Sequence, residues 1–112
     1  MTRSPELSRQ LSRMEEARRQ TQRQLDMVDR QITRRMTALI PDLLPRRTRY
    51  RGGKAPDPQA FLERYRSWLA ALTAERQPEI DALSRKLARQ EQVIARFLEQ
   101  HGEAVELSEQ VQ

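Results

Sequence analysis

The chain has 112 residues, of which 33% are charged, 37% are hydrophobic and only 4% are aromatic. A chain of this length forms one domain at most, and its composition fits either disorder or long helices with a narrow apolar seam. It has no cysteine and a single histidine, which excludes disulfides, thiolate metal sites and a histidine cluster within the chain. Because no apolar run approaches a membrane span of roughly 18 residues and the N-terminus lacks the apolar core of a secretion signal, we expect a cytoplasmic protein.

The positive charge is unevenly distributed along the chain. The formal net charge is +5 and the isoelectric point is about 10.6. Residues 1–40 carry nine Arg and five acids (+4), residues 41–58 carry five cations and two acids (+3), and residues 59–112 carry seven cations and nine acids (−2). The middle segment is therefore the most densely basic, which permits a polyanionic partner.

A first long helix is predicted over residues 4–40. Ser4, Pro5 and Glu6 form a typical helix start, with an N-cap, proline at the first position and an acid in the first turn. Apolar residues then follow alternating steps of four and three, which predicts a coiled-coil seam. Arg18 and Arg35 are the misfits in this frame. Their long side chains could extend past the seam to solvent, or could fix the register by meeting acids of the second helix. The seam positions are Leu7, Leu11, Met14, Thr21, Leu25, Val28, Ile32 and Leu39.

A bend is predicted over residues 41–57. This stretch begins at Pro41 and contains further prolines and the pair Gly52–Gly53, so no single helix should cross it. It also carries the basic cluster.

A second helix is predicted over residues 58–101, with Asp57 as N-cap and an acidic, frayed tail over residues 102–112. Pro78 lies inside the apolar pattern, where two steps of four through Arg76 join its halves. This spacing is typical of a stutter and predicts a kink near Pro78, with a true break as the alternative.

The predicted fold is all-α: a single-domain antiparallel two-helix hairpin, or coiled coil, with a kink near Pro78. Its first turns after the bend bear the widest apolar face in the chain, which we call the aromatic face. Two hairpins would cover this face by dimerising into a four-helix bundle. A three-helix monomer with a turn at Pro78 is the alternative. The aromatic face, as dimer or partner interface, comprises Phe61, Leu62, Tyr65, Trp68, Leu69 and Leu72.

Catalytic chemistry has little support in the sequence. No nucleophile, phosphate-loop or metalloprotease motif is present, and acid pairs such as Glu15–Glu16 lie among arginines as surface charge. His101, beside a helix end, is expected to be a packed or capping residue. We therefore expect no enzyme activity, no catalytic residue, no metal, no cofactor and no small-molecule substrate.

The basic bend is the best candidate site. Five cations lie within residues 46–54, beside a tyrosine that can stack on a base and glycines that let the backbone approach a ligand. Arginines of the first helix could extend the site. Most are expected to pair within the helix, as in Glu15–Arg19 and Asp26–Arg30, whereas Arg34 and Arg35 lack nearby acids. The predicted nucleic-acid-binding residues are Arg34, Arg46, Arg47, Arg49, Tyr50, Arg51 and Lys54.

The predicted function is that of a non-enzymatic accessory protein that contacts the phosphate backbone of nucleic acid, DNA rather than RNA, through this basic tip. A solvated loop, or one that meets an acidic protein surface, is the simpler interpretation of the same residues. The alternative function is a coiled-coil adaptor or stalk, such as a secretion, phage or plasmid component, that uses the tip and the aromatic face. The absence of asparagine and the preference for Arg over Lys indicate a GC-rich coding sequence of bacterial or phage origin.

Overall fold

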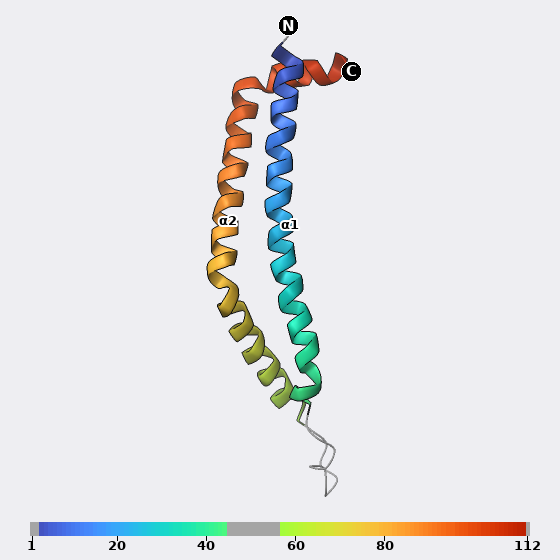
Figure 1. Cartoon of the computed structure of the whole chain (residues 1–112), viewed down its shortest axis with the longest axis vertical. Helices are drawn as coiled ribbons and strands as arrows, with labels where there is room; N and C mark the ends of the chain where they lie inside the picture. The colour runs from blue at the N-terminus through green and yellow to red at the C-terminus, as the bar shows by residue number, and fades with distance from the viewer. Residues whose placement is uncertain (1–2, 45–56, 112) are drawn as a thin grey trace, which may run out of the picture. The chain divides into compact units, whose positions relative to one another are not determined.

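The computed structural model describes residues 3–44 and 57–111 of the chain. These residues form two long α-helices, α1 (Arg3–Leu43) and α2 (Pro58–Val111), and contain no strand (Figure 1). The predicted all-α class is therefore confirmed over this part of the chain. Neither helix, within the same residues, has an apolar stretch long enough to cross a membrane.

The end of α1 lies beyond the position predicted from the sequence. The prediction ended this helix at residue 40, whereas α1 includes Pro41 and ends at Leu43. A proline in the last turn removes only its own hydrogen bond to the preceding turn, and the next amide still closes the helix, since Leu44 N donates to Ile40 O at 3.2 Å. The buried Leu43 side chain, 5% exposed, favours this extra turn.

The start of α2 matches its predicted cap. The helix begins at Pro58, and the Asp57 Oδ1 atom accepts a hydrogen bond from Gln59 N at 3.0 Å. The Asp57 carbonyl accepts from Phe61 N at 3.4 Å, which is the first intrahelical bond. Asp57 therefore satisfies one of the free amides that every helix start leaves.

Two predicted interruptions of α2 do not end the helix. α2 passes through Pro78, so the alternative of a true break there is wrong. It also continues past Gly102, the predicted stop, to Val111. Good helix formers follow this glycine, among them Glu103, Ala104 and Glu106, and together they offset its low helix propensity.

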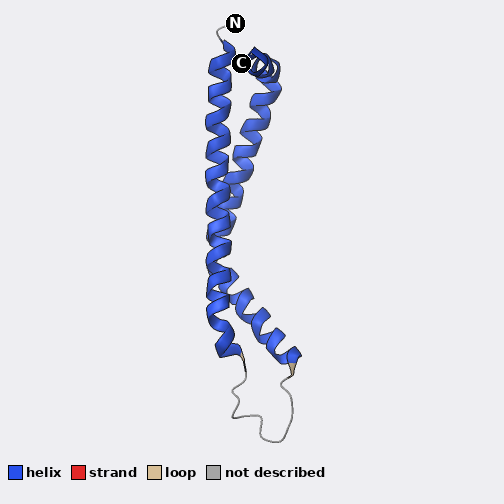
Figure 2. Ribbon diagram, turned by 90° about the vertical axis from the view of Figure 1, so that its right-hand side faces the viewer, coloured by secondary structure: helices blue, strands red, loops and turns tan. Residues whose placement is uncertain are grey.

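The described chain divides into two compact units, and each contains part of both helices. Unit 2, residues 27–79, pairs the end of α1 with the start of α2 (Figure 2). The two helices run antiparallel in this unit. Leu43 near the end of α1 is hydrogen-bonded to Arg64 near the start of α2, and Gln31, which precedes Leu43, is hydrogen-bonded to Arg76, which follows Arg64. The buried apolar side chains of unit 2 are Val28, Ile32, Met36, Leu43 and Leu72.

The seam of α1 changes its spacing within unit 2. The heptad frame placed Arg35 in the seam, but Met36 is the buried residue, at 1% exposure, and the Arg35 side chain is 57% exposed. Successive steps of four through Val28, Ile32 and Met36 are a stutter, which restores the residues per turn of an unstrained helix. The predicted stutter of α2 is confirmed at Arg76, whose side chain is only 27% exposed.

Unit 1, residues 1–26 and 80–112, contains the start of α1 and the later part of α2. Leu11 and Phe97 form its buried cluster, and Leu7, Met14 and Ile94 pack against them. The His101 ring lies 5.0 Å from the Phe97 ring, which agrees with a packed histidine.

Thr21 is the buried polar residue of the seam in unit 1, at 1% exposure. Its hydroxyl donates to the Ala17 carbonyl at 3.2 Å, so the buried oxygen has a partner within its own helix. The predicted seam of the first helix is thus confirmed at Thr21, as it is at Leu11.

Candidate functional surfaces

The predicted basic tip lies outside the described residues. Only Arg34 of the predicted nucleic-acid-binding set is described. The others, Arg46, Arg47, Arg49, Tyr50, Arg51 and Lys54, lie in the segment 45–56. The structure does describe the two helix ends from which this segment departs.

Arg64 of α2 caps the end of α1. Its guanidinium donates to the Leu43 carbonyl twice, from Nη2 at 2.9 Å and from Nε at 3.3 Å. A helix end leaves carbonyls without partners and has a negative partial charge, and α1 has no basic residue in its own last turn. Arg64 therefore supplies from the other helix the cation that α1 lacks. The sequence did not reveal this role, because it depends on which side of α2 faces α1.

Arg34 lies on the exposed surface of α1 and forms no ion pair with another described residue. Its helical neighbour four residues earlier is Arg30, a like charge, which is an unfavourable spacing. The predicted pair of Arg30 with Asp26 is not formed, because Asp26 accepts from the Gln22 side chain at 3.1 Å instead. Arg30 and Arg34 thus present two adjacent cations without counter-charges among the described residues.

Arg35 has a different role from the one predicted with Arg34. Its Nη1 atom lies 2.9 Å from the Glu75 carboxylate, so it links α1 to α2. Arg76 adds a second link, since its guanidinium donates to Gln31 at 2.8 Å and also pairs with Glu79 in α2. The idea that Arg35 meets an acid of the second helix is therefore confirmed, and its place beside Arg34 in a binding site is not.

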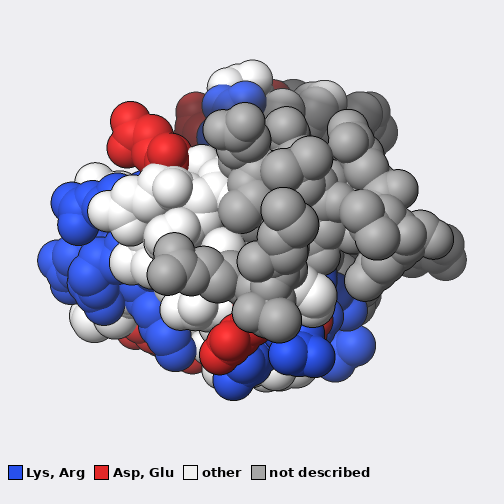
Figure 3. Space-filling view, turned by 90° about the horizontal axis from the view of Figure 1, so that it is seen from above, with Lys and Arg blue, Asp and Glu red and all other residues white. Residues whose placement is uncertain are grey.

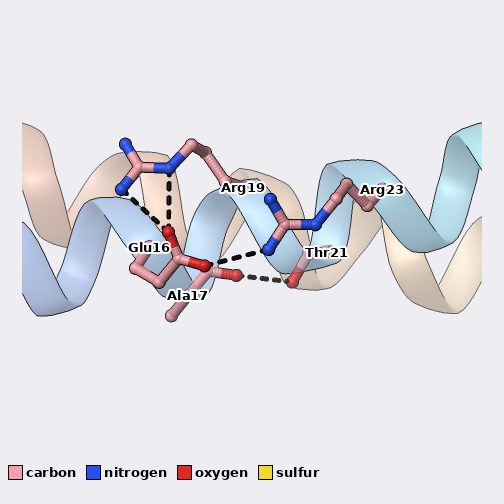
Figure 4. Close-up of polar contacts among 5 residues, drawn as sticks. All are labelled: Glu16, Ala17, Arg19, Thr21 and Arg23. Carbon is pink, nitrogen blue, oxygen red and sulfur yellow. Dashed lines mark hydrogen bonds and ion pairs between the residues drawn. The ribbon is translucent and has the colours of Figure 1, made fainter.

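The ion pairs of α1 in unit 1 converge on one carboxylate. Glu16 pairs with Arg19 and Arg23, each at 2.9 Å, while the predicted Glu15–Arg19 pair is absent from the described residues (Figure 4). Hydrogen bonds from Arg23 and then Arg19 hold the pKa of the Glu16 carboxyl below its ordinary value of 4.5. These two arginines are already occupied, so they are weaker candidates for a partner than Arg30 and Arg34.

The aromatic face divides into a packed part and an exposed part. Leu72 is 1% exposed and belongs to the core of unit 2. Phe61 and Tyr65 are half-buried, with ring centroids 6.2 Å apart. The exposed members are Leu62 at 40%, Trp68 at 46% and Leu69 at 36%.

Surface hollows occur in the described part of unit 1. One is lined only by residues of the first turns of α1, including Pro5, Ser8 and Arg13. Another is a groove with lining residues from both helices, Met14, Ala17, Lys86, Arg89, Gln90 and Val93. Viewed from above, Lys and Arg side chains gather at the left and lower edges of the molecular surface (Figure 3).

The chain was compared with protein families, curated proteins and solved structures. No protein-family model matches the chain, and neither the curated proteins nor the solved structures provide a similar protein.

Proposed function

We propose that this protein is a non-enzymatic accessory that binds the phosphate backbone of nucleic acid through residues 46–54, with Arg34 as an additional contact. The observation that carries the proposal is the Arg64–Leu43 cap. It ties together the two helix ends from which the basic segment departs. A segment with both ends fixed loses less conformational freedom on binding, which favours a recognition role.

The charges beside this segment support the same function. Arg34 and Arg30 are adjacent cations on an exposed helix surface, and no described residue compensates them. Their mutual repulsion weakens the helix slightly, so a folding role does not explain the pair. A phosphate backbone would supply the missing negative charge, since arginine binds phosphate oxygens through two parallel hydrogen bonds.

The test is fluorescence anisotropy of labelled duplex and single-stranded DNA and RNA, titrated with the full chain at several salt concentrations. We expect micromolar or tighter binding that weakens steeply as salt rises, because bound cations release counterions from the phosphates. Changing Arg46, Arg47, Arg49 and Arg51 together to Ala should abolish binding. Arg34→Ala should lower the salt slope by about one.

A matched control removes four arginines elsewhere. The variant Arg9→Ala/Arg13→Ala/Arg66→Ala/Arg85→Ala has the same net charge as the tip variant and leaves the basic segment intact. It should retain most of the affinity. Equal binding by the two variants, or no binding at low salt, would show that the tip is not a phosphate-binding site.

A protein adaptor is the second candidate function, and the exposure of Leu62, Trp68 and Leu69 favours it. Exposed apolar and aromatic side chains that lie together are typical of protein interfaces. In this proposal two chains pair through the aromatic face into a four-helix bundle, and α2 bends at Pro78, where one backbone hydrogen bond is lost. Both functions fit a cytoplasmic protein of bacterial or phage origin.

The measurement that separates dimer from monomer is the molar mass in solution by light scattering. Trp68→Ala and Leu62→Ser should reduce a dimer to the monomer without loss of helix. A monomeric wild-type chain at high micromolar concentration would contradict pairing through this face.

A further inference from the structure

In unit 1, α2 has a second row of regularly spaced residues besides its seam. The seam contacts α1 through residues such as Ile94 and Phe97. The second row follows alternating steps of four and three along the exposed surface of α2, which is the spacing of a helix face that packs against another helix. We call this row the outer stripe of α2. Its members, all exposed, are Ala82, Lys86, Arg89, Val93, Arg96 and Gln100.

The outer stripe is basic. It contains three cations and no acid. Lys86, Arg89 and Arg96 form no ion pair with another described residue. Like charges along one face weaken a helix slightly, so helix formation does not explain this arrangement. A partner with carboxylates at matching positions would replace the repulsion by attraction.

The groove of unit 1 lies beside the outer stripe and joins it to α1. Met14 of α1 is half-buried and Val93 of α2 is 50% exposed, so apolar side chains of both helices remain partly open to solvent. Ala17, which also lines the groove, is small and lets another backbone approach. Lys86 and Arg89 add positive charge to the lining. The groove therefore combines apolar surface with uncompensated cations.

An acidic amphipathic helix fits this combination better than a nucleic acid does. A third helix packs into the groove between two others by placing its apolar side chains there. Those side chains would cover Met14 and Val93, and flanking carboxylates would bind Lys86 and Arg89. A phosphate backbone would neutralise the cations, but its polar groups would gain nothing from the apolar surface.

We propose that the groove of unit 1 binds an amphipathic helix of another protein, with apolar side chains along one face and Asp or Glu on both flanks of that face. The buried Gln90 Oε1 atom has no hydrogen-bond partner, and a turn about its side-chain bonds would bring this amide to a donor on the bound helix. The site uses no residue of the aromatic face or of the basic tip, and it does not depend on nucleic-acid binding.

A synthetic peptide with this chemistry tests the proposal. The probe is a labelled peptide of three heptads with Leu at the seam positions and Glu at both flanking positions, where the glutamates oppose pairing of the peptide with itself. Fluorescence anisotropy at low salt should show micromolar binding by the full chain, and circular dichroism should show that the peptide becomes helical. Lys86→Glu/Arg89→Glu should weaken binding at least tenfold, since two attractions become repulsions.

Two further measurements separate a fitted groove from attraction of opposite charges. A matched peptide with Lys in place of Glu should bind the Lys86→Glu/Arg89→Glu variant more tightly than it binds the wild type. Val93→Gln changes no charge but removes an apolar contact, and it should weaken binding of the acidic peptide about threefold or more. An unchanged affinity in Val93→Gln would overturn the groove as the binding site.

The control Arg30→Glu/Arg66→Glu reverses two exposed cations outside unit 1 and should bind the acidic peptide within about threefold of the wild type. The variant without the four tip arginines should do the same, and circular dichroism should show unchanged helix content in every variant. Absence of binding by the wild type, or equal binding by the groove and control variants, would overturn the proposal. So would a groove variant that loses oligonucleotide binding but keeps peptide binding, or one that converts a wild-type dimer to a monomer, because the occupant would then be nucleic acid or a second copy.

Discussion

The two units hold their helices together by different means. In unit 2, polar contacts cross between the helices: Arg64 caps the end of α1, Arg35 pairs with Glu75, and Arg76 reaches Gln31. In unit 1 the hydrogen bonds and ion pairs named above stay within α1, and the helices meet through the Leu11–Phe97 cluster. These hydrogen bonds and ion pairs fix the register between the two helices of unit 2, the unit that contains the basic segment. In unit 1, cations such as Lys86 form no ion pair with another described residue, which suits a surface that a partner completes.

The largest effect is expected at the core of unit 2. Met36 is 1% exposed, so Met36→Ala should destabilise the chain by about 2–5 kcal/mol through lost burial and a cavity. Urea unfolding followed by circular dichroism measures this change. Met27→Ala is the matched control, because Met27 is 58% exposed, and it should shift the free energy of unfolding by no more than about 0.5 kcal/mol. Equal effects would mean that the seam does not pass through Met36.

A smaller effect is expected at the polar contact that most distinguishes unit 2. Arg64→Met keeps much of the side chain's apolar surface but removes the two hydrogen bonds to Leu43, and should cost about 1 kcal/mol. Arg64→Lys keeps the charge and should recover part of this loss. Thermal unfolding and hydrogen exchange at the amides of residues 40–44 would measure the effect. Unchanged exchange in Arg64→Met would show that the cap does not hold this end of α1.

A stabilising change is expected in unit 1. Gly102 lies within α2, and a Cβ atom added there would meet nothing within 4 Å. Gly102→Ala should therefore raise stability by about 0.5–1 kcal/mol and increase helix content, because alanine loses less backbone entropy. A loss of stability in unfolding experiments would contradict a helical conformation at Gly102.

The smallest effect concerns the ion pairs within α1. The pKa of Glu16 is lowered in the folded chain, so the pairs stabilise it above the unfolded pKa, and this contribution is lost as pH falls through the folded pKa. Arg23→Gln should move the pKa of Glu16 back toward 4.5, as followed by NMR titration of the carboxyl carbon. Both arginines are exposed, so the change in stability should be near the limit of detection. An unchanged pKa would contradict the role of Arg23.

Apolar periodicity was enough to predict two long helices, the cap at Asp57 and the stutter at Arg76. The predicted helix ends were wrong where they depended on a single proline or glycine. Pro41 and Gly102 are helix breakers by propensity, yet a buried Leu43 and a run of helix formers after Gly102 outweigh them. Periodicity did not reveal that Met36 rather than Arg35 is buried, because a strict heptad repeat allows only one set of seam positions. The Arg64 cap depends on how two helices face each other, which periodicity within one helix does not contain.

The Arg64 cap also affects how far the sequence and length of the connecting segment can vary. Residues 45–56 connect α1 to α2, and the two residues that flank this segment, Leu44 and Asp57, are each hydrogen-bonded to the adjacent helix. The entropy of closing a flexible loop grows only logarithmically with its length, so doubling the length costs about 0.6 kcal/mol. Insertions, deletions or exchanged motifs should therefore be tolerated between these helix ends with little loss of stability. The paired helices would then act as a scaffold on which a binding sequence can diverge quickly, and on which an engineer could graft another.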